Sequence, residues 1–180
     1  MTPIDIALLE DLDAYIEHIQ RHMRDNGRDG IYFSPFSSTY RRDPAGLKGR
    51  LRPKWEKSLQ DLGWERAFII WDGDRIVGHL DLERETIEPA GHRLALSMGL
   101  EYGYKGRGLG SRLMEEAIGF AKTLDGIEWI DLGVFSCNQP AQALYKKFGF
   151  VETGRVEDNF RVDGRSLSDI QMSLRTRREG

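Results

Sequence analysis

One stretch decides the fold of this chain: residues 98–111, which read Met-Gly-Leu-Glu-Tyr-Gly-Tyr-Lys-Gly-Arg-Gly-Leu-Gly-Ser. An apolar, strand-like segment ends in it, a group of glycines follows, and an amphipathic segment begins at once. Glycine lets the backbone turn sharply and lets a ligand approach it closely. The unpaired N–H groups at the start of the next helix point outward with the positive end of the helix dipole. The stretch therefore predicts an anion site suited to a phosphate or pyrophosphate.

The segments on either side of the glycines predict a parallel pair of strands. Residues 93–100 place an apolar side chain at every second position, as a half-buried strand does. Residues 109–123 carry an apolar stripe at helical spacing, and residues 128–136 read as the next strand. A strand, a helix and a strand in succession imply a parallel pair joined by a crossover helix.

Two short turns predict antiparallel hairpins elsewhere. Asp-Gly-Asp-Arg at 72–75 joins strands at 67–71 and 76–84, and Asp-Gly at 163–164 joins strands at 150–161 and 166–175. Residues 4–8 are expected to form an edge strand. In the strand 76–84, alternation places Ile76, Gly78, Leu80 and Leu82 on one face and Val77, His79, Asp81 and Glu83 on the other. We therefore predict the α/β class, with a mixed, mostly antiparallel sheet and helices on both faces.

The remaining segments predict three helices and one long irregular segment. Apolar residues recur at helical spacing over 10–23, and proline stands near the start of expected helices at 53–61 and 140–148, the second of which stops at Gly149. Residues 24–52 show no periodicity and are rich in Gly, Pro, Ser and Arg. The length of the chain favours a single domain over residues 1–180.

Composition excludes several classes of protein. The formal net charge is −3, from 26 basic and 29 acidic residues, so no overall positive field recruits nucleic acid. The single cysteine, Cys137, excludes an intramolecular disulfide and fits a reducing compartment. No apolar run is long enough to span a membrane, and the first residues lack the pattern of a signal peptide. The expected location is the cytoplasm.

The glycine turn is not specific by itself. A P-loop requires a lysine and a Ser or Thr after its last glycine, and the Rossmann fingerprint requires a glycine where Ser111 stands. A tight connection without a ligand is the plainer alternative, although four glycines within residues 103–110 exceed what a turn requires.

A second block, residues 132–150, reads Leu-Gly-Val-Phe-Ser-Cys-Asn-Gln-Pro-Ala-Gln-Ala-Leu-Tyr-Lys-Lys-Phe-Gly-Phe. Together the two blocks resemble the GNAT superfamily of N-acetyltransferases. That family carries Arg/Gln-x-x-Gly-x-Gly/Ala at the pyrophosphate turn, an Asn after the following strand, and then Ala-x-x-Leu-Tyr-x-x-x-Gly-Phe. The chain departs from the pattern at Lys105, which replaces Arg or Gln and keeps a positive charge. The resemblance covers about residues 67–175.

The resemblance implies a GNAT-like fold in which the parallel strands splay apart and the core over 67–175 binds the cofactor. Residues 24–52 would lie on the substrate side. It implies acetyl-CoA as the donor, no metal, and a primary amine of a small molecule or a protein as the acceptor. The acetyl group would pass directly to the amine in a ternary complex. A homodimer is common in the family.

The resemblance also assigns roles to single residues. The N–H of Leu100 would stabilise the oxyanion of the tetrahedral intermediate, and Gly99 favours a β-bulge beside it. Tyr145 would protonate the departing thiolate, unless it is only a packed tyrosine. Asn138 would bind the cofactor arm, cap the next helix, or do both. The expected cofactor-binding residues are Met98, Leu100, Lys105, Gly106, Arg107, Gly108, Leu109, Gly110, Ser111, Asn138 and Tyr145.

The general base is less defined by the sequence. Asp81, Glu83 and Glu101 all lie near the expected cleft, and each is also explained as a solvated or paired charge. Among them we select Glu83. If no base exists, the alternative function is a non-catalytic CoA-binding module with a regulatory or partner-binding role.

Three further features have a plain interpretation. Cys137 is expected to be a small buried residue rather than a nucleophile, because no histidine pairs with it in the sequence. His18 and His22 stand one helical turn apart, which suits a metal, but a solvated helix face is favoured. The basic residues of 40–54 are interpreted as a solvated face, with a contact to an anionic substrate or RNA as the weaker alternative.

Overall fold

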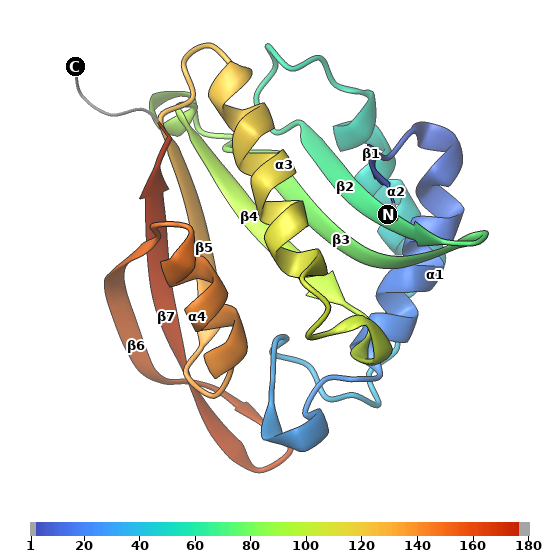
Figure 1. Ribbon diagram of the computed structural model, residues 1–180, viewed down its shortest axis with the longest axis vertical. Coiled ribbons are helices and arrows are strands. Elements are labelled where there is room, and N and C mark those ends of the chain that lie inside the picture. Colours follow the sequence, from blue (N-terminus) through green and yellow to red (C-terminus); the bar gives the residue numbers. More distant parts are fainter. Residues whose placement is uncertain (1–2, 177–180) are drawn as a thin grey trace.

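The computed structural model describes residues 3–176, and within them the strands form one seven-stranded sheet in the order β1-β2-β3-β4-β5-β7-β6 (Figure 1). The strands are β1 (Ile4–Ile6), β2 (Glu65–Asp72), β3 (Arg75–Arg84), β4 (Arg93–Leu100), β5 (Trp129–Phe135), β6 (Val151–Val162) and β7 (Arg165–Arg175). Among these strands only β4 and β5 pair in parallel. The predicted mixed, mostly antiparallel sheet is confirmed.

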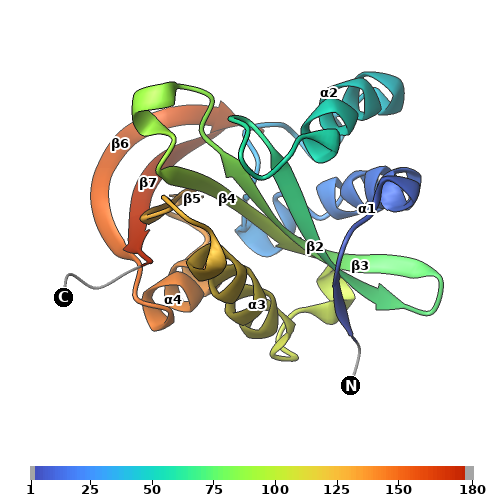
Figure 2. The ribbon, with the colours of Figure 1, turned by 90° about the horizontal axis from the view of Figure 1, so that it is seen from above.

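Helices cover both faces of the sheet (Figure 2). They are α1 (Leu12–Met23), α2 (Pro44–Glu56), α3 (Leu109–Thr123) and α4 (Gln139–Lys147). On the face of α3, Leu113, Met114 and Ala117 pack against Leu80 and Leu82 of β3 in the largest apolar cluster. On the opposite face, apolar residues of α1 and α2 pack against β2 in a second cluster. The sheet is therefore buried on both sides where it positions the site.

The parallel pair separates soon after it begins. Only three residues of β4, Arg93 to Ala95, pair with β5. Strand β5 instead pairs along its whole length with β7, while β4 continues beside β3 to its end. Figure 1 shows β4 and β5 diverging toward the end that carries the glycine turn. The splayed pair that the family resemblance implies is present.

The two predicted hairpins are confirmed by their turn geometry. Asp72 pairs with Arg75 and Val162 pairs with Arg165, which leaves two residues in each loop. Gly73 has φ of 63°, and Asp163 and Gly164 have φ of 50° and 75°. Two-residue hairpins require such positive φ values because their twist then matches that of the strands.

The predicted alternation of β3 is wrong at its start. The β2–β3 register shifts between Ile70 and Trp71, which is a bulge. As a result Ile76 packs in the cluster of α1 and α2, and Val77 packs in the cluster of α3. A bulge adds one residue to a strand and reverses the faces beyond it, so the alternation holds only from Gly78 onward.

The predicted helix at 53–61 is also wrong. The helix is α2, which begins at Pro44 and ends at Glu56, so Pro53 lies inside it. Asp43 caps its start by accepting hydrogen bonds from the backbone N–H of Ala45 at 3.2 Å and of Gly46 at 2.8 Å. The irregular segment predicted over 24–52 is shorter than expected for the same reason. Among residues 3–176, no helix has the length and apolar content needed to cross a membrane.

Candidate active site

The gap between β4 and β5 holds a cavity of about 650 Å³, which we call the inter-strand cavity. Its walls come from the unpaired end of β4, from β5, from the glycine turn and from the start of α4. Of the residues expected to bind the cofactor, those that line it are Met98, Leu100, Lys105, Gly106, Gly108, Gly110, Ser111, Asn138 and Tyr145. Arg107 and Leu109 belong to the same turn but do not line the cavity.

The glycine turn has the backbone geometry of an anion site. Gly106 and Gly108 have φ of 74° and 77°, and Gly108 is the N-cap of α3. The hydrogen bonds of the described backbone end at Lys105 N–H, which donates to Tyr102 O at 3.3 Å, and resume with Arg112 N–H, which donates to Gly108 O at 3.3 Å. The amides between them belong to the turn and to the first turn of α3, whose first N–H groups have no partner within the helix. They are available to oxygen atoms of a phosphate.

Two residues of the second block stand at the same cavity. Asn138 accepts a hydrogen bond from the N–H of Ala141 at 3.3 Å, so it caps α4 while it lines the cavity. The ring of Tyr145 is buried, and its burial raises the pKa of its hydroxyl. The phenol therefore keeps its proton at neutral pH. Asn138 and Tyr145 thus lie at the cavity where the family resemblance expects residues that contact the cofactor.

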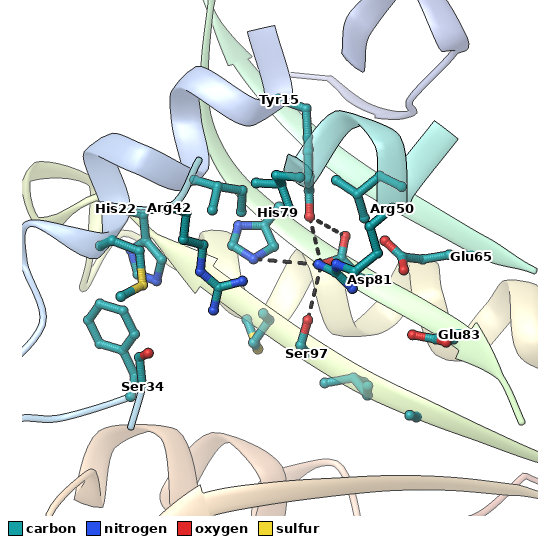
Figure 3. Close-up of a pocket in the computed structure, with 18 of the residues that line it drawn as sticks. Tyr15, His22, Ser34, Arg42, Arg50, Glu65, His79, Asp81, Glu83 and Ser97 are labelled. Atoms are coloured by element: carbon teal, nitrogen blue, oxygen red, sulfur yellow. Dashed lines mark hydrogen bonds and ion pairs between the residues drawn. The ribbon is translucent and has the colours of Figure 1, made fainter. Parts of the chain in front are cut away.

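A second cavity of about 320 Å³, which we call the α1-side cavity, lies beside β4 (Figure 3). It is enclosed by α1, α2 and strands β3 and β4. Six residues line both cavities: His22, Phe33, Pro35, Leu96, Ser97 and Met98. The two cavities thus meet at the middle of β4.

The floor of the α1-side cavity is a buried carboxylate, that of Asp81. Tyr15 donates its hydroxyl to the two carboxylate oxygens at 2.8 and 2.7 Å, and Ser97 donates to Oδ2 at 3.0 Å (Figure 3). Burial raises the pKa of Asp81 to about 6, and the two hydroxyl donors oppose that rise. Asp81 is therefore a carboxyl group that gains and loses a proton near neutral pH.

Three histidines gather beside Asp81. His18 Nε2 lies 2.9 Å from His79 Nδ1, and the ring of His22 is 5.7 Å from that of His79. Burial lowers the pKa of His18 to about 2 and that of His79 to about 4, and it also lowers the pKa of His22. The interpretation of His18 and His22 as a solvated helix face is wrong. Sequence did not show the cluster because α1 and β3 are brought together only by the fold.

Gly99 belongs to this cluster rather than to a bulge. The β3–β4 register runs without a shift through His79 and Gly99, so the predicted bulge in β4 is absent. A Cβ at position 99 would clash with His22 Nε2 and stand 2.7 Å from His79 Cε1. The glycine is thus needed because two imidazole rings pack against the strand at this point.

The other expected acids are held in ion pairs. Glu83, our selected base, accepts a hydrogen bond from Lys54 Nζ at 2.5 Å at the edge of the α1-side cavity. Glu101 accepts from Arg21 Nε at 2.9 Å and from Arg75, and it touches His18. Glu101 lines neither cavity. Of the three expected acids, Asp81 is the one that is both buried and part of the cavity lining.

The basic segment 40–54 divides into two groups. Lys48 and Arg52 form surface ion pairs with Asp13 and Glu56, as a solvated face predicts. Arg42 instead lines the α1-side cavity and Lys54 binds Glu83 at its edge, so the solvated interpretation is wrong for these two. Arg50 is exposed as that interpretation predicts, but it also lines the cavity.

Two remaining expectations concern reactive or metal-binding side chains. Cys137 is partly buried against Tyr32 and Phe135, as expected for a packing residue. Within residues 3–176, no group of three or more His, Cys, Asp or Glu side chains has the arrangement of a metal site.

The fold and the site together define a class of protein with a split sheet, a glycine turn at the mouth of the split and a second cavity behind it. A model of the acetyltransferase (GNAT) family matches residues 31–150. The chain therefore belongs to the acetyltransferase (GNAT) family, and the predicted resemblance is confirmed.

Individual relatives agree with this membership. The chain is 33% identical over 97 residues to the L-amino acid N-acetyltransferase AaaT of Escherichia coli (strain K12), an alignment that covers 53% of this chain and 59% of that protein. It is 32% identical over 92 residues to the N-alpha-acetyltransferase RimI of Mycobacterium tuberculosis (strain ATCC 25618 / H37Rv), covering 51% and 56%. The chain thus spans little more than half the length of these relatives. The structure of yncA from Salmonella typhimurium, solved with its cofactor acetyl-CoA, is similar with a TM-score of 0.76 at 16% identity, over 100% of this chain and 96% of that one.

Proposed function

We propose that this chain is an acetyl-CoA-dependent N-acetyltransferase that moves an acetyl group to a primary amine by direct transfer in a ternary complex. One observation carries the proposal: the inter-strand cavity and the α1-side cavity meet at Leu96, Ser97 and Met98. Donor and acceptor can then enter from opposite sides of β4 and touch at the junction. The acetyl-CoA bound to yncA and the amine-acetylating names of AaaT and RimI support the same assignment.

The inter-strand cavity is suited to coenzyme A along its whole length. At its mouth, the amides that follow Lys105 and the N-terminus of α3 would bind the pyrophosphate. Farther in, β4 has lost its partner strand beyond Ala95, so its backbone groups are open to the amide-bearing arm of the cofactor. Asn138 and Tyr145 lie at the end of this path.

The oxyanion donor follows from the alternation of backbone groups in a strand. Glu101 N–H donates to Val77 O of β3 at 3.0 Å. Successive N–H groups of a strand point to opposite edges, so the N–H of Leu100 is directed away from β3 toward the gap left by β5. This direction supports Leu100 as the donor to the oxygen of the tetrahedral intermediate.

The bond changes are those of an acyl transfer. The neutral amine nitrogen attacks the thioester carbonyl carbon, the C–O double bond opens to an oxyanion, and the amine loses a proton. The C–S bond then breaks as the carbonyl re-forms, and the departing sulfur takes the proton of the Tyr145 hydroxyl. The products are the acetylated amine and CoA.

Asp81 is a better candidate than Glu83 for the proton acceptor. A general base works best when its pKa lies near the working pH, and the pKa of Asp81 is about 6. The carboxylate of Glu83 already binds Lys54. We therefore assign the proton to Asp81, with Tyr15 and Ser97 holding its oxygens in place.

The test is release of free thiol from acetyl-CoA in the presence of a panel of primary amines, with the acetylated product identified by mass spectrometry. Amine-dependent thiol release with a product heavier by one acetyl group is expected. Binding of acetyl-CoA by calorimetry without any product across the panel would instead establish the alternative, a non-catalytic CoA-binding module.

A further inference from the structure

Two arginines line the α1-side cavity, and one of them holds a buried donor without a partner in the described part of the chain. Arg50 projects from α2, and Arg42 from the segment just before it; in Figure 3 both side chains extend toward His79 and Asp81. With respect to residues 3–176, Arg50 forms no hydrogen bond or ion pair, and the buried Nε of Arg42 has no partner. A buried donor without a partner costs free energy, so the Nε of Arg42 points to a missing acceptor. Arg50 is exposed but lines the same cavity, where its donors are open to a ligand.

The carboxylates of the cavity do not supply the missing acceptor, because each already accepts hydrogen bonds from other residues. Asp81 is bound by Tyr15 and Ser97. Glu65 accepts from Trp55 Nε1 at 3.4 Å and Lys54 Nζ at 3.5 Å, and Glu83 also binds Lys54. The donors of Tyr15 and Ser97 are neutral and the charge of Arg50 acts on Asp81, so the group left without an acceptor among the described residues is the buried Nε of Arg42. A polycationic acceptor would offer no hydrogen-bond acceptor to the buried Nε of Arg42.

We propose that the acceptor is a small amino acid-like molecule that carries a carboxylate beside its primary amine, and that Arg42 and Arg50 bind this carboxylate. The planar guanidinium group matches a carboxylate with two parallel hydrogen bonds. The amine would lie at the junction with the inter-strand cavity, and the carboxylate would lie under α2. A cavity of about 320 Å³ is at the lower end of the range for ligand pockets, which fits a small acceptor.

The inference that the acceptor carries an amine rests on the proposed function, and the inference that it carries a carboxylate rests on the two arginines. The amine and the carboxylate are therefore tested separately. Matched pairs of acceptors are needed: L-amino acids and the corresponding amino acid amides, with spermidine as a polycationic comparison. Initial rates measure transfer. Calorimetry of the same compounds with the protein saturated with CoA measures binding without turnover.

The variants are Arg50→Gln and Arg42→Gln, and the matched control is Arg52→Gln. Arg52 lies on the same helix but forms a surface pair with Glu56 and does not line the cavity. We expect wild-type protein to prefer amino acids over their amides. Each cavity variant should lose about 10- to 100-fold in kcat/KM for amino acids, mainly through KM, with less than threefold change for amides. Arg52→Gln should behave as wild type.

Several results would overturn the proposal. They are equal or better use of amides or spermidine by wild-type protein, equal losses for both members of each pair in the variants, or amino acid binding that does not depend on either arginine. If no amine is acetylated but amino acids bind with an affinity that Arg50→Gln removes, the carboxylate site stands and the catalytic proposal fails. Arg50 is exposed at the surface of its helix, so its substitution is not expected to disturb folding even if that of Arg42 does.

Discussion

Asp81 is a carboxyl group that is buried, and its burial disfavours the charged form in the folded protein. Its surroundings disfavour the charged form, which raises its pKa from 3.8 to about 6. An acid with a raised folded-state pKa reduces stability as the pH rises through the interval between the two values. A group that costs stability at neutral pH while facing a cavity is typical of a functional position.

Replacing Asp81 by Asn should therefore separate activity from stability. Tyr15 and Ser97 can still donate to the amide oxygen, but the base is lost, so kcat/KM should fall by about 100-fold or more. The free energy of unfolding in urea at pH 7.5 should stay equal or rise. In wild-type protein kcat/KM should increase as the pH rises through about 6. Glu83→Gln is the matched comparison; a larger loss there than in Asp81→Asn would return the role of base to Glu83.

Tyr145 is the residue whose removal should affect chemistry without affecting the cofactor. Its hydroxyl donates no hydrogen bond to another residue of 3–176, and the ring packs near Phe150 with centroids 5.8 Å apart. Tyr145→Phe keeps that packing, so acetyl-CoA affinity measured by calorimetry should change by less than threefold. We expect kcat to fall by about 10²-fold. An unchanged kcat would remove Tyr145 from the role of acid.

The residues of the site differ in how far they could be predicted from sequence. The turn glycines and Asn138 were found because their roles are local: positive φ at Gly106 and Gly108, and a cap of α4 by Asn138. The contact between His18 and His79 joins residues 61 positions apart, and no local pattern encodes it. The same holds for Arg42 and Arg50, because their place in the α1-side cavity depends on where α2 packs against the sheet.

At the scale of the elements, β4 borders both the inter-strand cavity and the histidine cluster, and Gly99 is the residue that makes this possible. One edge is left open to the inter-strand cavity, and one face receives the histidines of α1 and β3. A glycine in a strand commonly marks such a close approach. The sequence pointed to Gly99 as unusual but suggested a bulge, because the packing partner comes from a distant helix.

Gly99→Ala should consequently destabilise the protein. The added Cβ meets His22 and His79, both buried, so rings or strand must move. We expect the free energy of unfolding to fall by about 1–3 kcal/mol. Gly119→Ala in α3 is the control, since nothing lies within 4 Å of its added Cβ and alanine favours a helix by about 0.5–1 kcal/mol. Urea unfolding measures both; equal stability of Gly99→Ala and wild type would refute the packing argument.

The boundaries of α2 show how a local signal can be overlooked. Asp43 and Pro44 form a cap and first position, and Leu47, Leu51 and Trp55 follow at intervals of four. This pattern is weak because Gly46, Gly49 and several charged residues dilute it. Pro53 was a misleading start signal, since tertiary packing tolerates it inside the helix.

At the scale of the whole molecule, the buried titratable groups predict how stability depends on pH. His18 and His79 have folded-state pKa values of about 2 and about 4 against an ordinary 6.5. Their neutral burial gives stability that is present above pH 6.5 and is lost as the pH falls from 6.5 through 4. Asp81 acts in the opposite direction between about pH 4 and 6.

Acidification from pH 7.5 to 5 should therefore lower the urea midpoint, and Asp81→Asn should steepen the decrease by removing the opposing group. Urea titrations of both proteins at the two pH values measure this. A shallower decrease in Asp81→Asn than in wild type would show that Asp81 is not held with a raised pKa.

The split sheet joins these scales, because it brings a cofactor path and an acceptor cavity to one point on β4. The most direct measurement is the initial rate of thiol release over a matrix of acetyl-CoA and amino acid concentrations. Direct transfer in a ternary complex predicts double-reciprocal lines that intersect. Parallel lines, which indicate an acetylated enzyme intermediate, or the absence of any amine-dependent rate would contradict the account.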